Sequence, residues 1–522
     1  MDERGGLGVN FVGNTYDVTL DTCSEEPIHI PGAIQPHGVL FVLSEPDLTV
    51  LQASANAKDF IGRSVEEVLG ERVGSLLSSG QVAAVVDALG NTDPRESNPV
   101  RIEFSKANDG SPLDAAVHRH KGFSFLELEP AAPSAKSHFT QFYKNVSRLT
   151  QQMQATTNIA ELLNVCVRGI RILTGFDRVW IYEMQPNLDI YIAAEDGLPR
   201  LESFLDFFFP ASDIPMQARQ LYLLNSIRAI ADVNYVPVPI QPLVNPKNHQ
   251  LTDMSLAELR SVSPIHIEYL KNMEVMASMS VSIIVNGKLW GLIACHHYEG
   301  PRFLNYELRK ACTFLAQVLS TEIGKRKMED EYESRTKGAR IQAELLVRMS
   351  ESEDKLKGLL SGKPNLLDVV PADGAVLWSG GECTSVGKIP PVNRIAAIIE
   401  WLGRKNLKKL AAYSALREAE LSFEDIRQTA SGLLAIQVSH KDKCHLLWFR
   451  PEVAQTVKWA GDPEKAVIAD FEGKRLTPRK SFQLWKQNVE GKCIEWKAHE
   501  LEAAENLGKM VKVVFGSKMR SQ

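Results

Sequence analysis

The segment of residues 205–219 combines features that suit a ligand-binding loop. It places an apolar aromatic run before Asp213, and Pro210 and Pro215 stand on either side of that acid. Each proline fixes its own φ, lacks a backbone donor and biases the preceding residue toward extended geometry. Asp213 therefore lies in a stiff, irregular segment, where its carbonyl and carboxylate can meet a partner outside any helix or strand. An ordinary loop with a solvated aspartate is the alternative interpretation.

A second group of polar residues stands farther along the chain in apolar surroundings. It consists of Arg228, Arg260, His266, Ser278, Ser280 and His296. A buried arginine needs a partner, because an unpaired buried charge is costly, and Asp213 can pair with only one of the two. The surplus charge indicates an anionic ligand, whose carboxylates the arginines would hold by bonds of roughly 1.5–3 kcal/mol each. The alternative is that both arginines are exposed, which is the commoner state of arginine.

Metal binding and nucleophilic catalysis find weaker support. Histidine and cysteine come close together only at residues 295–297 (Cys-His-His) and 118–120 (His-Arg-His). Neighbours on a strand point to opposite faces, so one side offers two ligands at most, which makes a weak zinc site. The chain lacks a G-x-S-x-G elbow and a glycine-rich phosphate loop. We expect no metal and no catalytic centre; an enzyme or metal protein using His266, His296 and Cys295 is the rival interpretation.

Length and composition indicate a multidomain globular protein. A chain of 522 residues predicts about three domains, and 44% hydrophobic with 24% charged residues is ordinary. The formal net charge of −5 argues against a nucleic-acid binder. Seven scattered cysteines without a CxxC pair predict neither a disulfide framework nor a thiolate zinc site. Because the sequence shows no basic-then-apolar leader and no apolar run of membrane-spanning length, we expect a cytoplasmic protein without membrane contact.

The predicted elements form three α+β modules, each with a mostly antiparallel sheet. The first module runs from a proline-rich segment before a strand at 39–43 to a strand at 124–129, and residues 130–136 indicate a linker. The second contains a strand at 178–182 and a long excursion at 232–258, which suggests function or disorder. Its last two strands, 277–285 and 289–297, form a hairpin turned by Asn286-Gly287.

A very long helix, or two helices in line, is predicted from about Tyr306 to Leu360. The mixed-sign run 325–331 indicates a solvated face of that helix. The third module begins near Leu366, is interrupted by an excursion at about 453–495, and ends with a helix from about Trp496.

Several motifs give the sequence a specific resemblance. They are Cys23 followed by PIHIPGAIQPHG at 27–38, PASDIP at 210–215, LRSVSPIH at 259–266, YLKNM at 269–273, LWGLIACHH at 289–297, and WAG with PRKSF at 459–461 and 478–482. In this order they resemble a bacteriophytochrome from about residue 20 to 510. The resemblance implies a flexible extension (1–20), a PAS domain (21–130), a GAF domain (138–325), a PHY domain (326–510) with its tongue at about 453–495, and a tail (511–522).

The resemblance also implies the ligand and its attachment. Phytochromes that use more reduced bilins carry the attachment cysteine at position 265, which is Ile265 here. We therefore expect biliverdin, joined to Cys23 by a thioether to a ring-A vinyl group. The segment near Ile34 is expected to thread through the 232–258 excursion as the knot of this family.

Further roles follow from the same resemblance, residue by residue. Arg228 and Arg260 are expected to hold the propionates, helped by Ser278, Ser280 and His296; Asp213, Ile214, Pro215 and His266 are expected beside the pyrroles; and Tyr182, Phe209 and Tyr269 are expected around ring D. Acceptors such as the Asp213 carbonyl favour the protonated pigment. Light is expected to rotate ring D, and an Asp213–Arg479 pair, with Trp459 and Ser481 of the tongue, to report the change.

Two features depart from the family pattern. Phe209 stands where the family usually has Tyr, and Glu183-Met184 replaces a frequent Arg-Phe. The missing hydroxyl predicts an altered balance of photostates. The chain also ends at Gln522, before the histidine kinase or other output domain that usually follows. We expect a homodimeric red/far-red photoreceptor core with an unknown output partner; a GAF sensor of a small ligand such as a cyclic nucleotide is a second rival.

Overall fold

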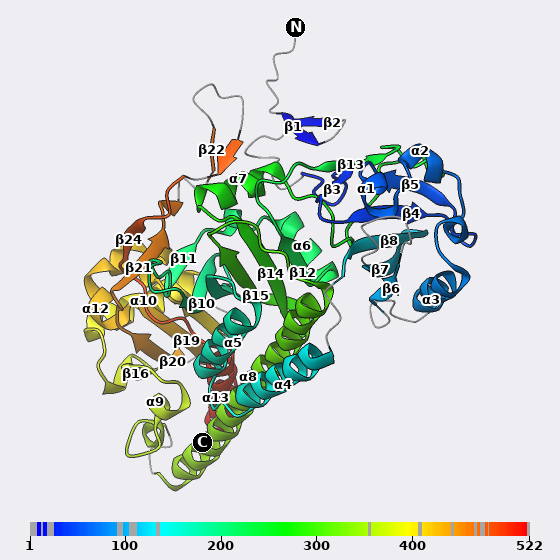
Figure 1. The fold of residues 1–522 in the computed structure, drawn as a ribbon. Coiled ribbons are helices and arrows are strands. Elements are labelled where there is room, and N and C mark those ends of the chain that lie inside the picture. Colours follow the sequence, from blue (N-terminus) through cyan, green and yellow to red (C-terminus); the bar gives the residue numbers. More distant parts are fainter. Residues whose placement is uncertain are drawn as a thin grey trace. The chain divides into compact units, whose positions relative to one another are not determined.

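The computed structural model describes residues 8–11, 14–17, 26–90, 98–103, 112–131, 136–352, 356–405, 410–439, 443–463, 467–469, 476–478 and 480–518. Cys23 and Arg479 lie outside these residues. The chain divides into two compact units (Figure 1), Met1–Gly324 with Lys458–Trp485, and Lys325–Val457 with Lys486–Gln522. The three expected α+β sheets and the long helix are confirmed, and two of the sheets belong to the first unit.

The first sheet is antiparallel and takes one strand from the 232–258 excursion. Its order is β3 (Ala33–Ile34), β13 (Val238–Gln241), β5 (Val50–Ser54), β4 (Val39–Leu43), β8 (Phe123–Pro130), β7 (Leu113–His120) and β6 (Val100–Ile102). Helices α1 (Ala57–Ile61), α2 (Val65–Val68), η2 (Val73–Ser75) and α3 (Ser79–Gly90) contribute to its main core. A separate hairpin pairs β1 (Gly8–Phe11) with β2 (Asn14–Asp17). The long excursion is thus structural as well as connecting.

The expected threading concerns the segment around Ile34. Ile34 is fully buried and pairs with Val238 of β13. On its other side, Gln35 N donates to Leu259 O at 2.8 Å and Ser261 N donates to Ala33 O at 3.0 Å. The excursion and the residues directly after it therefore hold this segment from two sides, while the knot itself stays a prediction.

The second sheet alternates its side chains between two cores. Its antiparallel strands are β12 (Ile227–Ile230), β14 (Ala277–Val285), β15 (Lys288–His297), β9 (Arg178–Met184), β10 (Ile190–Gly197) and β11 (Phe207–Phe209). Along β9, Val179 and Ile181 face a core with α4 (Lys136–Gln154), α5 (Ile159–Thr174) and the start of α8 (Tyr306–Glu351). Trp180 and Tyr182 face the other core, on the side of α7 (Pro264–Asn272). This period of two is what a strand buried on both faces requires.

Two local predictions can be judged at once. Asn286 and Gly287 form the two-residue turn between β14 and β15 with φ of 52° and 73°, as a type I′ hairpin requires, so that prediction is confirmed. The long helix, however, ends at Glu351 rather than near Leu360. Near this end the Ser350 hydroxyl donates to Val347 O at 2.6 Å, a local bond that competes with helix continuation.

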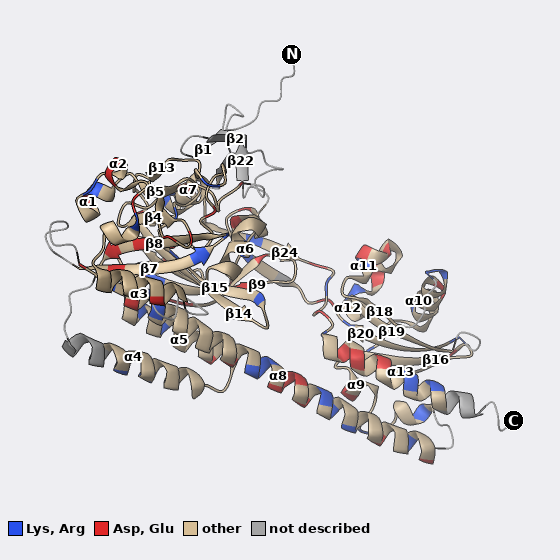
Figure 2. Cartoon of the chain, turned by 90° about the vertical axis from the view of Figure 1, so that its right-hand side faces the viewer, with Lys and Arg blue, Asp and Glu red and all other residues tan. Residues whose placement is uncertain are grey.

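The second unit is built on an antiparallel five-stranded sheet. Its order is β17 (Glu382–Gly387), β16 (Gly374–Ser379), β20 (Cys444–Arg450), β19 (Gly432–Ser439) and β18 (Leu410–Tyr413). Its helices are η6 (Lys357–Leu359), α9 (Leu366–Val369), α10 (Val392–Arg404), α11 (Leu416–Ala419), η7 (Leu421–Ile426), α12 (Arg427–Ala430) and α13 (Ala498–Lys518). Figure 2 shows basic and acidic positions following one another along the middle of α8. Most of the run 325–331 is exposed, as expected, although Arg326 is buried.

The excursion predicted at 453–495 contains four strands in the part that is described. They are β21 (Gln455–Ala460), β22 (Val467–Ala469), β23 (Leu476–Pro478) and β24 (Leu484–Val489). Within the first unit, Lys458 and Trp459 of β21 pair in parallel with Phe207 and Phe208 of β11. This part of the excursion therefore extends the second sheet next to the aromatic run that precedes Asp213.

Candidate functional site

A cavity in the first unit gathers seven of the residues singled out in the sequence. With its open mouth it encloses about 1100 Å³. The predicted residues that line it are Asp213, Ile214, Pro215, Arg228, Arg260, His266 and Tyr269. Ile265 lines it too, as do Glu26 and Ile28 from the N-terminal segment. Residues more than two hundred positions apart thus meet in one cavity large enough for a sizeable ligand.

The loop around Asp213 is held by Arg219 of the helix that follows it, a residue for which the sequence analysis predicted no role. Pro210 caps η5 (Ala211–Asp213), and Pro215 caps α6 (Met216–Leu224). The buried Arg219 guanidinium donates to Ile214 O at 2.6 Å, Ala211 O at 3.1 Å and Leu188 O at 2.8 Å. These bonds satisfy carbonyls of an irregular segment that has no ladder to do so. No local motif pointed to this role, and one of the three partners, Leu188, comes from a separate loop.

Arg228 and Arg260 are the cations of the cavity. Arg228 donates from Nη1 to Glu258 O at 3.0 Å and Arg260 O at 3.2 Å, and from Nη2 to Ala257 O at 3.3 Å. Arg260, only 7% exposed, donates from Nη1 to Ile28 O at 3.1 Å. These hydrogen-bond partners are neutral backbone carbonyls, and among the described residues neither arginine forms an ion pair. Two neighbouring positive charges thus lack a carboxylate at ion-pair distance in the described part of the chain.

The electrostatics of this pair favour a bound anion. Burial lowers the pKa of Arg228, and burial together with the neighbouring Arg228 charge lowers the pKa of Arg260 well below its usual range. The Nε atom of Arg260 is buried and has no hydrogen-bond partner. A buried donor without a partner costs about 1–3 kcal/mol. A carboxylate in the cavity would relieve both penalties, so the arrangement is that of an anion-binding site.

Tyr269 and His266 connect the arginines with Asp213. The Tyr269 hydroxyl donates to Oδ2 of Asp213 at 2.9 Å. Its ring lies parallel to the His266 ring at 6.1 Å between centroids, and Phe482 meets it edge-on at 5.3 Å. Both residues project from α7, whose first turn is capped by Ser263 with Pro264 as its first residue. One face of a short helix therefore supplies an aromatic wall and the partner of Asp213.

The two predicted histidines are held in the neutral state. Burial, then the positive charge of Arg228, lowers the pKa of His266 to about 4. Burial, then the charges of Arg178 and His266, lowers the pKa of His296 to about 3. Near neutral pH each ring can therefore donate one hydrogen bond and accept one. The Nδ1 atom of His296 is buried without a partner.

Some predicted residues lie outside the cavity wall. Ser278, Ser280 and His296 occupy neighbouring positions of β14 and β15, and Ser280 reaches the cavity through its bond to Tyr222, a lining residue that the sequence analysis missed. Tyr182 and Phe209 pack against each other at 5.9 Å between ring centroids. Their cluster also contains Trp180, so they form part of the core behind the cavity.

The predicted signalling residues are only partly described. Trp459 is 9% exposed and packs against Phe208 at 5.8 Å between ring centroids, while Ser481 is exposed. Pro478 lines the cavity and accepts a bond of 3.4 Å from Asn272 of α7. The tongue segment of the first unit therefore touches the cavity wall. Arg479 and Cys23 lie outside the described residues.

Glu26 is a cavity residue that only the three-dimensional structure reveals. Glu26 is 6% exposed, its Oε2 atom accepts from the Ser263 hydroxyl at 3.0 Å, and its Oε1 atom is buried with no hydrogen-bond partner among the described residues. Burial raises the pKa of this carboxyl to about 7, although the Ser263 bond works in the opposite direction. In the sequence, Glu26 stands three residues after Cys23. This closeness to the expected attachment cysteine is the local feature that could have suggested Glu26 as a cavity residue.

The fold and the cavity define a sensory module made of three successive domain types. Residues 23–131 match the PAS fold, residues 158–325 match the GAF domain, and residues 338–520 match the phytochrome region. The chain is 41% identical over 503 residues to cyanobacterial phytochrome B of Nostoc sp., covering 96% of this chain and 67% of that protein. It is 36% identical to a bacteriophytochrome of Xanthomonas campestris, of which it covers 79%.

A solved structure agrees with these sequence matches. The photosensory core module of the Stigmatella aurantiaca phytochrome superposes with a TM-score of 0.83 at 39% identity, covering 96% of this chain and 99% of that one. The chain belongs to the phytochrome family and carries its PAS-GAF-PHY photosensory core. It spans about two thirds of the length of the Nostoc relative. Among the described residues, no helix is long and apolar enough to cross a bilayer.

Proposed function

We propose that this chain is a red/far-red photoreceptor whose cavity binds biliverdin, with Cys23 as the site of covalent attachment. The observation that carries the proposal is the pair Arg228 and Arg260, two cations in one cavity for which the described residues supply no ion-pair partner. A linear tetrapyrrole with two propionates supplies two carboxylates on one flexible molecule. It would also offer polar groups to the buried, unpartnered oxygen of Glu26.

The residues of the cavity suit distinct parts of such a ligand. The arginines hold carboxylates by charge-assisted bonds, with Ser278, Ser280 and His296 of the neighbouring strands in support. The Asp213 carbonyl and the neutral His266 are acceptors for pyrrole N–H groups, and Ile214 and Pro215 provide apolar contact. Tyr269 lines the part of the cavity where ring D of the bilin would rotate. Tyr182 and Phe209 lie in the core behind this part of the wall. When bound, the bilin supplies light absorption and a double-bond isomerisation.

The tongue is the element that supports signal transmission in this proposal. Its described part touches the cavity through Pro478 and Phe482 and the second sheet through Trp459. We infer that an Asp213–Arg479 pair, with Ser481 nearby, senses the state of the pigment and biases the tongue between strand and helix. Helix α8 would then carry the change to a homodimeric partner and to an output domain or downstream protein.

Cys23 is favoured as the nucleophile because the other thiols are poorly suited. Cys166, Cys295, Cys312, Cys444 and Cys493 are buried, and Cys383 is half-buried. Burial raises the pKa of Cys312 to about 12 and that of Cys493 to about 11, so neither forms much thiolate at neutral pH. Position 265, where reduced bilins attach in relatives, is an isoleucine in the cavity wall.

The test is assembly with pigment. Purified protein is mixed with biliverdin or, separately, with phycocyanobilin, and red absorption and zinc-stained fluorescence on a denaturing gel are recorded. We expect biliverdin to give both signals, Cys23→Ala to lose only the gel signal, and the matched control Cys383→Ala to keep both. A folded protein that stays colourless with either pigment contradicts the proposal, and would favour the small-ligand sensor.

A further inference from the structure

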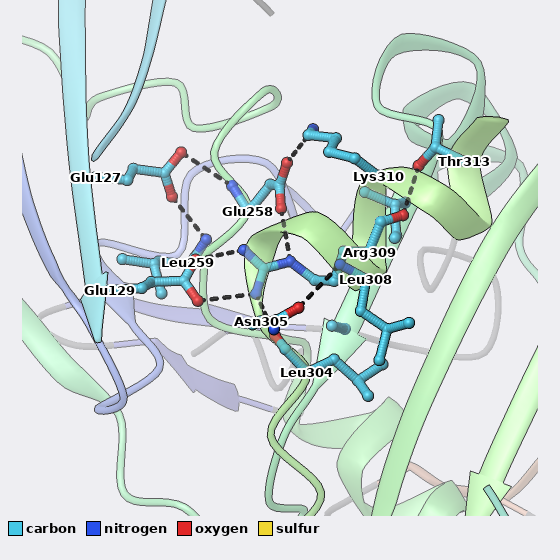
Figure 3. Close-up of polar contacts among 12 residues, drawn as sticks. Glu127, Glu129, Glu258, Leu259, Leu304, Asn305, Leu308, Arg309, Lys310 and Thr313 are labelled. Atoms are coloured by element: carbon cyan, nitrogen blue, oxygen red, sulfur yellow. Dashed lines mark hydrogen bonds and ion pairs between the residues drawn. The ribbon is translucent and has the colours of Figure 1, made fainter. Parts of the chain in front are cut away.

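A buried cluster of ionisable side chains lies outside the cavity, where β8, the loop at 257–260 and the first turns of α8 meet. Figure 3 shows its five members, Glu127, Glu129, Glu258, Arg309 and Lys310. Arg309 donates to both carboxylate oxygens of Glu129, at 2.9 and 2.7 Å, and to Glu258 at 3.0 Å. Lys310 donates to the other oxygen of Glu258 at 2.7 Å. We call these five residues the charge cluster.

Glu258 connects this cluster to the cavity through a single residue. Its carboxylate lies between Arg309 and Lys310, whereas its backbone carbonyl accepts from Nη1 of Arg228 at 3.0 Å. Burial acts to raise the pKa of this carboxyl, but the charges of Lys310 and Arg309 outweigh it and lower the pKa to about 2. Glu258 is therefore ionised at any ordinary pH, so its link to α8 is permanent.

Glu127 fixes the same loop from the opposite side. Its two oxygens accept from the backbone nitrogens of Glu258 at 3.1 Å and Leu259 at 2.7 Å (Figure 3). The loop thus has its N–H groups bound to the first sheet, its carbonyls bound to Arg228 and its side chain bound to α8. A loop constrained in three directions holds a guanidinium more precisely than a loop held by its ends alone.

We propose that Glu258 is a positioning residue, which fixes the anion-binding Arg228 relative to the first turns of α8 and so links the ligand carboxylates to that helix directly, independently of the tongue. This inference rests on the proposed function. Only Glu258 stands between Arg228 and Arg309. Arg309 lies on α8, which also carries Cys312 and Leu315 of the second-sheet core. A displacement of the ligand carboxylates would therefore reach α8 through one residue.

The experiment compares two pigments that differ only in charge at the propionates, biliverdin and biliverdin dimethyl ester. Red absorption reports the uptake of each pigment. The ratio of the two uptake rates measures how strongly the arginines favour free carboxylates over esters. A variant that merely weakens the fold slows both pigments and leaves the ratio unchanged. Glu258→Gln is the test variant, and it is expected to fold because Arg309 keeps both bonds to Glu129. Lys310→Gln is the milder second variant.

We expect the wild type to prefer biliverdin, and Glu258→Gln to reduce that preference about fivefold, which corresponds to about 1 kcal/mol, the size of one ordinary hydrogen bond. The matched control Glu299→Gln removes an exposed ion pair to Arg200 in the same domain and should leave the ratio unchanged. If Arg228→Gln reduces the preference and Glu258→Gln does not, the inference is overturned while the proposed function stands. If the wild type takes up neither pigment, or does not distinguish them, the propionate site itself is wrong.

Discussion

The hydroxyl of Tyr269 donates a hydrogen bond of 2.9 Å to Oδ2 of Asp213, and this bond ties α7 to the stiff segment between Pro210 and Pro215. Both residues line the cavity, so the bond joins two of its walls. Any ligand that moves either wall must strain or break this contact. The pair is therefore a natural place for the state of a ligand to alter the protein.

Removing this hydroxyl should change the behaviour of the pigment more than the fold. We expect Tyr269→Phe to lower the free energy of unfolding by about 0.5–1.5 kcal/mol and to change photoproduct yield or dark recovery. The measurement is a set of absorption spectra after red and far-red light. Tyr191→Phe is the matched control, because Tyr191 donates to Asp206 at 2.7 Å on the exposed surface. Equal photochemistry in both variants would contradict the role given to Tyr269.

Arg260 should stabilise the complex with pigment and destabilise the pigment-free protein. Arg260→Gln removes a buried cation with an unpartnered Nε, so we expect it to raise the unfolding free energy of the pigment-free protein by about 1 kcal/mol. The same change should slow biliverdin uptake about tenfold. Thermal unfolding and uptake kinetics test the two halves separately. A variant that loses stability and binds normally would show that Arg260 is structural.

Phe209 offers a test of the departure from the family pattern. The ring is fully buried against Tyr182 and Trp180. A hydroxyl introduced by Phe209→Tyr must find an acceptor or cost about 1–3 kcal/mol of stability. We expect the variant to shift the balance between photostates or the photoconversion yield, as measured by absorption spectra. Unchanged dark state, kinetics and yield would refute the idea that this position tunes the pigment.

Glu127 predicts the pH dependence of stability. Burial outweighs its two backbone bonds and raises the pKa of its carboxyl from 4.5 to about 8. Between these values the folded protein holds a proton that the unfolded chain has lost, so the unfolding free energy should fall as pH rises through this window. The slope is at most about 1.4 kcal/mol per pH unit.

Chemical denaturation between pH 7 and 8 tests this contribution, and a Glu26 variant is compared because Glu26, with a pKa of about 7, completes its own titration in the same interval. Glu127→Gln keeps the side-chain shape and should flatten the profile in that interval. Glu26→Gln should leave the same interval sloping. A profile that is equally steep in wild type and Glu127→Gln would show that the carboxyl of Glu127 is ionised throughout.

Local patterns in the sequence predicted what depends on neighbouring residues. The turn at Asn286-Gly287, the strand at 39–43 and the break imposed by Pro210 and Pro215 follow from backbone preferences, which operate over a few residues. The domain order and most of the cavity residues followed from the motifs. The end of α8 at Glu351 could not be predicted from the sequence, because the length of a helix depends on packing and on side-chain bonds at its terminus.

The sequence by itself predicted that Asp213 can pair with only one of Arg228 and Arg260, and it left open whether the two arginines are buried. Only the tertiary structure decided that Glu258 offers Arg228 its carbonyl while its carboxylate pairs with Arg309 and Lys310 instead, leaving the cavity cations for a ligand. It also brought Glu26 into that cavity, more than two hundred residues from Arg260 in the chain. Burial and charge pairing are properties of the folded neighbourhood, and residue spacing along the chain does not contain them.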